Sequence, residues 1–349
     1  MHWLKTTLLW PLHLAGLATG QKDFMANPVL GSKTLNGWGL HVLRKRAAHA
    51  LCQWRRHGME SRLPVAWVRA YQTDGCVVLP DFLPATECEQ LKLDVARLQQ
   101  TAIEMVQRPA TTRRFNLDRD TCAPYPALAK LLDNAPLFDL LRYAAGYGGA
   151  PIVAVQCIHT DAEGEWHDPQ TDWHADTFHS TAKAWLFLHD VAADEGPFAY
   201  VPGSHALTGK RLAWEQEQSI GAPTHVNRLH AKGSFRATEA ELGAMGYGEP
   251  VLGVVRSNTL VVADTSGFHR RTPSPQATVR VEVYLSLRRN PYLAGLYPSL
   301  LGLPGLKRRW AEVALNVYRW QQRKGIASWH PAPVPALSDI ERERLGLKP

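Results

Sequence analysis

The chain lacks the cysteine patterns that build disulfide frameworks. Its 349 residues include five cysteines, an odd number, widely spaced and without a Cys-x-x-Cys pair. This usage argues against a disulfide-stapled fold and favours a reducing compartment, so we expect a cytoplasmic protein. The five are Cys52, Cys76, Cys88, Cys122 and Cys157.

A membrane-spanning run is also lacking at the N-terminus. Residues 1–18 are largely apolar with one lysine, Lys5, and they are interrupted by Pro11 and His13, whereas a spanning helix needs about 20 apolar residues. As a secretory signal the segment is imperfect, because its basic part is one lysine and residues 17–20 form a poor cleavage site. We expect an interfacial or packing segment, with a signal peptide as the alternative.

Internal repeats and low-complexity segments are absent as well. The chain is 45% apolar and 20% charged, which is typical of a globular protein with one substantial core. Its net charge is +7, and basic residues gather in residues 40–62 and 306–325, where apolar residues recur at helical spacing. Such helices could lie on an anionic membrane or pack on the core with solvated charged faces. No recognised binding motif accompanies them, so we expect no nucleic-acid partner.

What the chain does contain is a His-x-Asp triplet, His174 and Asp176, followed far downstream by His269. Residues i and i+2 of a strand point to the same side, so His174 and Asp176 can bind one ion together. Two imidazoles and one carboxylate form the ligand set of mononuclear non-haem Fe(II) sites, which leave positions open for a co-substrate and O₂. Arg280 follows His269 where an oxygenase of this kind needs a cation for the far carboxylate of 2-oxoglutarate.

The motifs around these residues resemble the phytanoyl-CoA dioxygenase family of Fe(II)- and 2-oxoglutarate-dependent oxygenases. The family's opening strand, the helix after it, the strand after His-x-Asp, a Gly-Pro turn and a Pro-Gly-Ser-His loop have counterparts here in the same order. These counterparts are residues 71–83, 84–91, 184–191, 195–198 and 201–205. His-x-Asp alone would be a weak signal, but the Pro-Gly-Ser-His block in register with both metal motifs is specific.

This resemblance implies that His174, Asp176 and His269 bind iron and that Arg280 anchors 2-oxoglutarate. O₂ is then the second co-substrate. Thr177 and Lys183 are candidates for the other side of the 2-oxoglutarate site, and the sequence does not choose between them.

The chain departs from the family next to the distal histidine. The family often offers a small hydroxyl there, whereas this chain has Arg270 and Arg271, with Thr272 one place later. Either Arg271 or Thr272 could touch 2-oxoglutarate.

Other histidines offer competing readings of the metal site. His159 and Asp161 form a second His-x-Asp, but no matching strand and Gly-Pro turn follow at the right distance. We expect His179 to face substrate or a polar neighbour and His205 to make a structural hydrogen bond.

Apolar periodicity predicts a mainly β fold with helical flanks. Short β-branched and aromatic runs separated by Gly, Pro and Asp favour a sandwich or barrel, and a double-stranded β-helix (a cupin-like jelly roll) suits an enclosed metal site. The predicted strands are residues 75–79, 152–156, 184–188, 259–263 and 279–287. The predicted helices are residues 85–100, 127–133 and 136–145.

Three regions follow from this pattern. We expect a basic N-terminal extension over residues 1–65, the oxygenase domain over 66–290 and a basic helical C-terminal extension over 291–349, with a proline-rich tail ending in a short helix. Residues 208–248 read as an insertion that could act as a lid and select substrates.

The implied reaction is hydroxylation of an unactivated C–H bond in a small-molecule or lipid-like substrate, with release of succinate and CO₂. Halogenating relatives replace the carboxylate ligand, so Asp176 favours oxygen transfer, while desaturation and cyclisation stay open. Alternatives are a peripheral membrane oxygenase acting on a lipid or glycolipid, and a non-catalytic cupin-like binding protein. The sequence decides neither the substrate nor the oligomeric state.

Aromatic residues near the motifs could line an apolar pocket or belong to the core: Trp173, Phe178, Trp185 and Trp214.

Overall fold

Two antiparallel sheets dominate the computed structural model, which describes residues 10–162, 167–294, 329–332, 334 and 336–347. The larger sheet has the strand order β1-β10-β6-β12-β4-β3-β2-β13, and the smaller has the order β8-β5-β11-β7-β9. The strands are β1 (Cys76–Leu79), β2 (Ile103–Gln107), β3 (Ala110–Asn116), β4 (Ile152–Thr160), β5 (Trp173–His174), β6 (Ala182–Phe187), β7 (Phe198–Tyr200), β8 (Arg236–Ala237), β9 (Val251–Leu252), β10 (Thr259–Asp264), β11 (His269–Arg271), β12 (Thr278–Leu287) and β13 (His330–Pro331).

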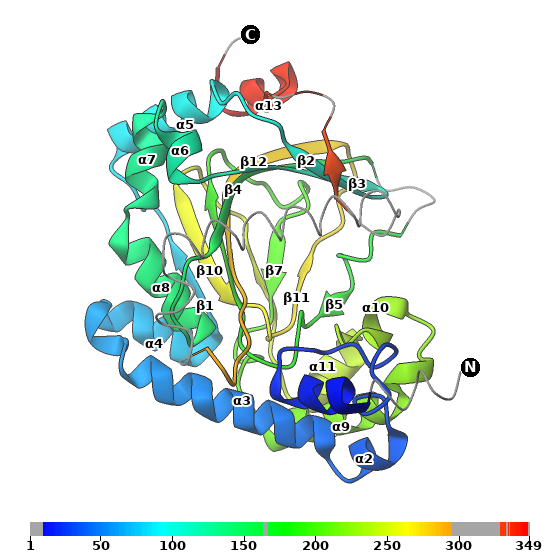
Figure 1. Cartoon of the computed structure of the whole chain (residues 1–349). Coiled ribbons are helices and arrows are strands. Elements are labelled where there is room, and N and C mark those ends of the chain that lie inside the picture. Colours follow the sequence, from blue (N-terminus) through cyan, green and yellow to red (C-terminus); the bar gives the residue numbers. More distant parts are fainter. Residues whose placement is uncertain (1–9, 163–166, 295–328, 333, 335, 348–349) are drawn as a thin grey trace.

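The two sheets face each other and enclose an interior lined by both (Figure 1). Trp185 of β6 and Tyr284 of β12 come from the larger sheet, and Tyr200 of β7 comes from the smaller; all three belong to one buried cluster. Two facing antiparallel sheets of this kind form a jelly roll. The predicted mainly β, double-stranded β-helix fold is therefore confirmed.

Strand β12 shows how the sequence builds this arrangement. Val281, Val283 and Leu285 are fully buried in the core on the outer side of the larger sheet. The intervening Arg280, Glu282 and Tyr284 line the interior cavity. This period-two alternation places one face of the strand under helices and the other toward the functional site.

Helices cover the outer face of the larger sheet (Figure 1). They are α4 (Val65–Asp74), α5 (Ala85–Ala96), α6 (Arg119–Cys122), α7 (Pro126–Leu132) and α8 (Ala135–Ala145). The first long predicted helix is real but ends at Ala96 instead of residue 100, and the other two agree to within one residue. Strands β2 and β3, which continue the sheet beyond β4, were not predicted.

The N-terminal region packs on the insertion, residues 208–248, which lies between strands β7 and β9 of the smaller sheet. Helices α2 (Lys33–Gly37) and α3 (Leu40–His57) lie against α9 (Gly209–Gly221). The insertion also contains α10 (Arg228–Ala231), α11 (Glu239–Met245) and strand β8, which pairs with β5. Short 3-10 turns are η1 (Gly16–Ala18), η2 (Glu60–Arg62) and η3 (Ala222–Thr224). Residues 208–248 are thus an ordered layer of the fold beside the strand that carries His174.

Buried charges hold α3 against α9. Glu215 accepts hydrogen bonds from Lys45 at 2.7 Å and from Arg211 at 2.8 Å, and its other oxygen lies 2.8 Å from His41. The basic residues at the start of α3 are therefore not a solvated face, because Arg44 and Lys45 are both buried. Only Arg46 of this basic triplet is exposed.

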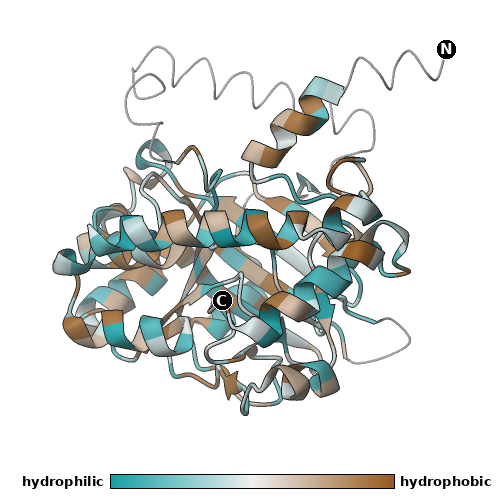
Figure 2. Cartoon of the chain, turned by 90° about the horizontal axis from the view of Figure 1, so that it is seen from below, coloured by the Kyte–Doolittle hydropathy of each residue, from teal (hydrophilic) through white to brown (hydrophobic). Residues whose placement is uncertain are grey.

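The helices on the face seen in Figure 2, which is the underside of the view in Figure 1, carry both hydrophilic and hydrophobic residues along their length. Among the described helices, none is both long enough and apolar enough to span a membrane. The predicted basic helix over residues 306–325 lies outside the described residues. Beyond it, β13 pairs with β2 and α13 (Asp339–Arg344) begins with a capping box at Ser338, which matches the predicted short C-terminal helix.

Candidate metal centre and active site

The smaller sheet brings the two distant histidines together. His174 on β5 and His269 on β11 are antiparallel partners, with ring centroids 4.4 Å apart. Asp176 Oδ1 lies 3.9 Å from His174 Nε2 and 3.8 Å from His269 Nε2. One ligand atom from each of the three residues lies within 4.8 Å of the others. These three residues, which we call the His-Asp-His group, were all predicted from the sequence.

Backbone carbonyls orient both imidazoles. His174 Nδ1 lies 2.7 Å from the carbonyl of Asp172, and His269 Nδ1 lies 3.0 Å from that of Gly267. A carbonyl can only accept, so each Nδ1 donates and each Nε2 keeps a lone pair. His269 Nε2 is buried and has no hydrogen-bond partner within the described chain. Such an orphaned acceptor beside a second imidazole fits a cation between them.

Burial keeps these histidines neutral. It lowers the pKa of His174 well below its usual value, with His269 adding to the effect, and it lowers the pKa of His269 to about 4. Burial alone would raise the pKa of Asp176, but Lys183 and the two imidazoles hold it well below its usual value. The site thus offers two neutral nitrogens and one carboxylate, the protonation states that metal binding needs.

Three contacts fix Asp176. Its backbone N–H donates to the carbonyl of Thr265 at 2.8 Å, and its own carbonyl accepts a hydrogen bond from the side chain of Lys22. The amine of Lys183 lies 2.7 Å from Asp176 Oδ2. Because Lys183 occupies Oδ2, Oδ1 is the oxygen turned toward the imidazoles.

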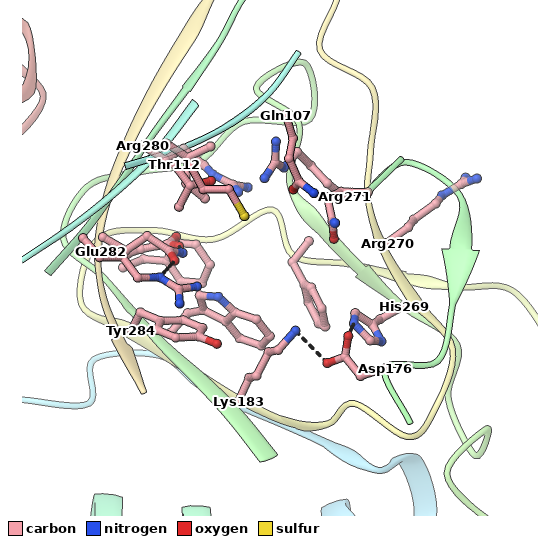
Figure 3. A pocket seen from close by; sticks show the side chains of 18 of the residues that line it. Gln107, Thr112, Asp176, Lys183, His269, Arg270, Arg271, Arg280, Glu282 and Tyr284 are labelled. Carbon is pink, nitrogen blue, oxygen red and sulfur yellow. Dashed lines mark hydrogen bonds and ion pairs between the residues drawn. The ribbon is translucent and has the colours of Figure 1, made fainter. Parts of the chain in front are cut away.

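The His-Asp-His group opens into a cavity of about 240 Å³ between the two sheets. Figure 3 shows Arg280, Glu282 and Tyr284 along one wall, with Asp176, Lys183 and His269 at the other side. The remaining lining residues are mostly polar: Met105, Gln107, Thr112, Arg114, Gln156, Ile158, Gln170, His174, Trp185, Phe187, Phe198, Arg270 and Arg271.

Two arginines meet in the cavity away from the His-Asp-His group. Arg280 is buried, and its Nη1 donates to the carbonyl of Gly196 at 2.7 Å. Arg271 Nη1 lies 3.1 Å from Asp168 Oδ2. Burial and the neighbouring Arg280 lower the pKa of Arg271 to about 10. A carboxylate placed between two such guanidiniums would relieve their repulsion and accept hydrogen bonds from both.

The other predicted co-substrate contacts are placed less favourably. Lys183 lines the cavity, whereas Thr177 and Thr272 are not among the lining residues. The Thr272 hydroxyl donates to the carbonyl of Pro197 at 3.0 Å, so it is already used.

The competing histidines lie elsewhere. His159 Nε2 pairs with Glu341 at 2.7 Å, and neither His179 nor His205 lines the cavity. Of the four aromatic residues proposed for an apolar pocket, Trp185 lines the cavity. Trp173 and Trp214 belong to the buried cluster around α9, and Phe178 packs under the guanidinium of Arg44.

Sequence reasoning missed Arg114, Gln156 and Glu282 as cavity residues. Glu282 lies two positions after Arg280 on one strand, so the alternation that selects Arg280 also selects Glu282. No comparable signal marks Gln156 or Arg114, because their place in the cavity depends on the pairing of β3 with β4 and of β4 with β12.

Comparison with known proteins agrees with this geometry. Residues 71–232 match the family model described as phytanoyl-CoA dioxygenase (PhyH), a segment that includes His174 and Asp176 and stops before His269. No curated protein matches the chain in sequence.

Similar solved structures include the non-heme alpha ketoglutarate dependent epimerase SnoN from nogalamycin biosynthesis, at 19% identity and a TM-score of 0.43 over 64% of this chain and 83% of that one. HygX from Streptomyces hygroscopicus with iron bound has 17% identity and a TM-score of 0.38, over 64% and 86% of the two chains. EctD from S. alaskensis with bound Fe has 17% identity and a TM-score of 0.39, over 64% and 76%.

The family match and the ordered motifs agree with the His-Asp-His group, whose two histidines lie on paired strands of one sheet and whose Asp176 follows β5. Two neutral imidazoles and one carboxylate are the donor set of non-haem Fe(II) oxygenases, and they suit that metal better than a closed structural zinc site. Over residues 71–232 the chain is therefore similar to the phytanoyl-CoA dioxygenase family, and its His-Asp-His group has the donor set of an iron- and 2-oxoglutarate-dependent oxygenase.

Proposed function

We propose that this oxygenase hydroxylates an unactivated C–H bond of a small-molecule substrate. His174, Asp176 and His269 hold Fe(II), and Arg280 anchors the far carboxylate of 2-oxoglutarate. The observation that carries the proposal is the meeting of three ligand atoms within 4.8 Å in a cavity that also contains a buried guanidinium with an open side. When bound, iron, 2-oxoglutarate and O₂ supply an oxidant strong enough to replace a C–H hydrogen by a hydroxyl group, with succinate and CO₂ released.

The protein's own residues prepare this chemistry by position. The carbonyls of Asp172 and Gly267 keep the imidazole lone pairs directed at one point, and Lys183 leaves Oδ1 of Asp176 free for the metal. The aromatic side chains of Trp185, Phe187 and Phe198 line the cavity. They limit the access of bulk water to the reacting carbon.

We assign the second co-substrate contact to Arg271 rather than to Thr272. Arg271 lines the cavity beside Arg280, whereas the Thr272 hydroxyl is engaged with Pro197. Lys183 supports Asp176 and is a weaker candidate for contact with 2-oxoglutarate. Thr177 stays a prediction that no contact supports.

The alternative of a peripheral membrane enzyme gains no support from α3. Arg44 donates to the carbonyls of Leu17, Thr19 and Gln21, and Lys45 pairs with Glu215, so neither cation is available to a lipid surface. The domain boundary at residue 65 also stays a prediction, and the contacts of α3 with α9 cross it.

Anaerobic titration of Fe(II) and 2-oxoglutarate, followed by visible absorption, tests the proposal. Wild type should develop a metal-to-ligand charge-transfer band. Asp176→Ala and His174→Ala should lose it, because each removes one of three protein ligands. Succinate formation should fall to background in the same variants.

His57→Ala is the matched control, because His57 is an exposed histidine with an 87% exposed side chain and does not line the cavity. It should behave as wild type. A wild-type protein without the band under reducing, iron-replete conditions would contradict the proposal and favour a binding protein of the same fold.

A further inference from the structure

One carboxylate oxygen in the cavity has no partner. Glu282 is 1% exposed, and its Oε1 accepts a hydrogen bond from Gln156 Nε2 at 2.6 Å. Its Oε2 is buried without a hydrogen-bond partner among the described residues. A buried carboxylate is costly unless its acceptor sites are filled, so this oxygen needs a donor that the described residues do not supply.

The cations of the cavity do not supply that donor. Lys183 is paired with Asp176, and Arg271 with Asp168. Arg280 donates to Gly196 instead of to its neighbour on β12. Within the described residues, none of these three cations forms an ion pair with Glu282.

A row of side chains across the larger sheet fixes Glu282 in this state. Arg114, Gln156 and Glu282 lie opposite one another on β3, β4 and β12. Arg114 Nε donates to Gln156 Oε1 at 2.7 Å, which turns the amide so that its NH₂ meets Glu282 Oε1. The Arg114 guanidinium also lies 4.1 Å from the ring centroid of Tyr284. These three side chains therefore form a hydrogen-bonded polar wall of the cavity, in which Glu282 Oε2 is the acceptor without a partner.

We propose that Glu282 recognises the substrate that this oxygenase oxidises. Its Oε2 accepts a hydrogen bond from a hydroxyl or a primary ammonium group of that substrate. This inference rests on the proposed function. Ionised 2-oxoglutarate carries only acceptors and two negative charges, so it cannot fill Oε2 and would be repelled by it. The substrate is the other molecule that enters the cavity and can supply this donor, and the test below distinguishes it from water.

The rest of the cavity agrees with a polar substrate. Glutamines and arginines outnumber apolar side chains along it. Phe187 lies opposite Glu282 on the neighbouring strand, and Trp185 lies opposite Tyr284. Rings of this kind pack on the apolar side of a small polyol or amino alcohol, and they also attract an ammonium group. A plain hydrocarbon chain would bury Glu282 Oε2 without a donor, so the wall disfavours a simple acyl chain at this point.

The test is calorimetric binding of paired small probes to the anaerobic, Fe(II)- and 2-oxoglutarate-loaded protein. The donor-bearing probes are ethanolamine, 4-aminobutan-1-ol, glycerol and myo-inositol. Each is compared with its O-methylated form, which removes the hydroxyl donors. The two amines are also compared with their N-trimethylated forms, which keep the positive charge and the hydroxyl but remove the ammonium N–H donors. Donor-bearing probes should bind about tenfold more tightly, as expected for a hydrogen bond to a charged group. The methyl ethers identify a hydroxyl as the donor, and the trimethylated amines identify an ammonium group.

Glu282→Gln supplies the control within the site, since it keeps the size and one carbonyl oxygen of the side chain and removes the charge. The preference for donor-bearing probes should shrink to within about twofold in this variant. The proposal is overturned if no probe binds better than its capped partner in wild type, which would leave water as the occupant of the site. It is also overturned if Glu282→Gln keeps the full preference. The charge-transfer band of the probe-free protein separates these outcomes from a failure of the oxygenase assignment itself.

Discussion

The side-chain amine of Lys22 donates a hydrogen bond to the backbone carbonyl of Asp176, although 154 positions separate them in the chain. The segment around Lys22 is held on both sides. Phe24 N–H donates to the carbonyl of Ala231 at 3.2 Å, and a side chain at Gly233 would collide with the carbonyl of Lys22. The N-terminal region therefore forms part of the support of the metal centre.

Replacing Lys22 with methionine should weaken metal binding. The substitution removes the hydrogen bond that fixes the Asp176 backbone, and partners that orient a metal ligand are typically worth about 10–100-fold in affinity. We expect the dissociation constant for Fe(II), or for Co(II) as a spectroscopic substitute, to rise by about tenfold. Lys33→Met, at an exposed position of α2, is the matched control. Equal Co(II) affinity in both variants would show that the contact does not orient Asp176.

Replacing Arg280 should affect 2-oxoglutarate more than metal. Loss of a charge-assisted contact to a carboxylate corresponds to about 10–100-fold in affinity, so Arg280→Ala should raise the KM for 2-oxoglutarate by that factor. Arg280→Lys should recover part of the loss, because a lysine keeps the charge without the planar fork. Initial rates of succinate formation at varied 2-oxoglutarate measure both. Arg119→Ala, which removes a 78% exposed arginine, should leave the KM unchanged, and an unchanged KM in Arg280→Ala as well would assign the anchor to another residue.

Glu215→Ala should destabilise the whole fold. Lys45, Arg211 and His41 all contact this carboxylate in a buried site, and removing one partner of a buried ion pair costs about 3–5 kcal/mol. Chemical denaturation should show a loss of that size in a single transition. Glu217→Ala, at an exposed position of the same helix, should change the free energy of unfolding by less than about 0.5 kcal/mol. Similar losses in the two variants would mean that α3 does not depend on Glu215 for its packing.

Stability should fall as the pH drops from about 6.5 toward 4. Burial lowers the pKa of His205 and of His230 to about 4, whereas the unfolded chain titrates near 6.5. Between these values the unfolded state binds more protons, so each histidine adds up to about 1.4 kcal/mol of destabilisation per pH unit. Above pH 6.5 their contribution is fully present and constant.

Denaturation of the metal-free protein at pH 7.5, 6 and 5 measures this slope. His205→Asn and His230→Asn should each flatten it, because a group that cannot be protonated no longer distinguishes the two states. A slope that both variants leave unchanged would assign the acid sensitivity to other buried groups.

The sequence predicted those parts of the fold in which local pattern and burial agree. Strand β12 was recognised as one of the β-branched and aromatic runs. The helix over Ala135–Ala145 was also recognised, and in the structure Pro136 lies in its first turn and Gly146 caps its end. Strands β2 and β3 escaped notice because their side chains are only partly buried and mix charged with apolar residues. The place of β3 is set by its pairing with β4, and β2 in turn pairs with β3; the β3–β4 pairing is a tertiary contact that no local pattern encodes.

The metal site was predictable for a similar reason, and its surroundings were not. His174 and Asp176 form a recognisable triplet, although β5 ends at His174, and His269 carries a recognisable motif, whereas Lys22 and Arg114 reach the site from segments far away in sequence. The basic helix over Leu40–His57 was located correctly, but its charges were assigned to the surface. Burial of Arg44 and Lys45 depends on carbonyls and a carboxylate that only the folded chain brings near them.

Because the two faces of β12 have opposite surroundings, the strand cannot tolerate a shift of its register by one residue. Inserting or deleting one residue between Thr278 and Arg280 would exchange the rows, driving Arg280 and Glu282 into the hydrocarbon beneath α8 and turning Val281 and Val283 toward the His-Asp-His group. A two-residue insertion would restore the inside–outside order while moving each side chain one step along the strand. Indels in this segment should therefore obey a parity rule, with odd lengths abolishing the fold and even lengths only misplacing the site.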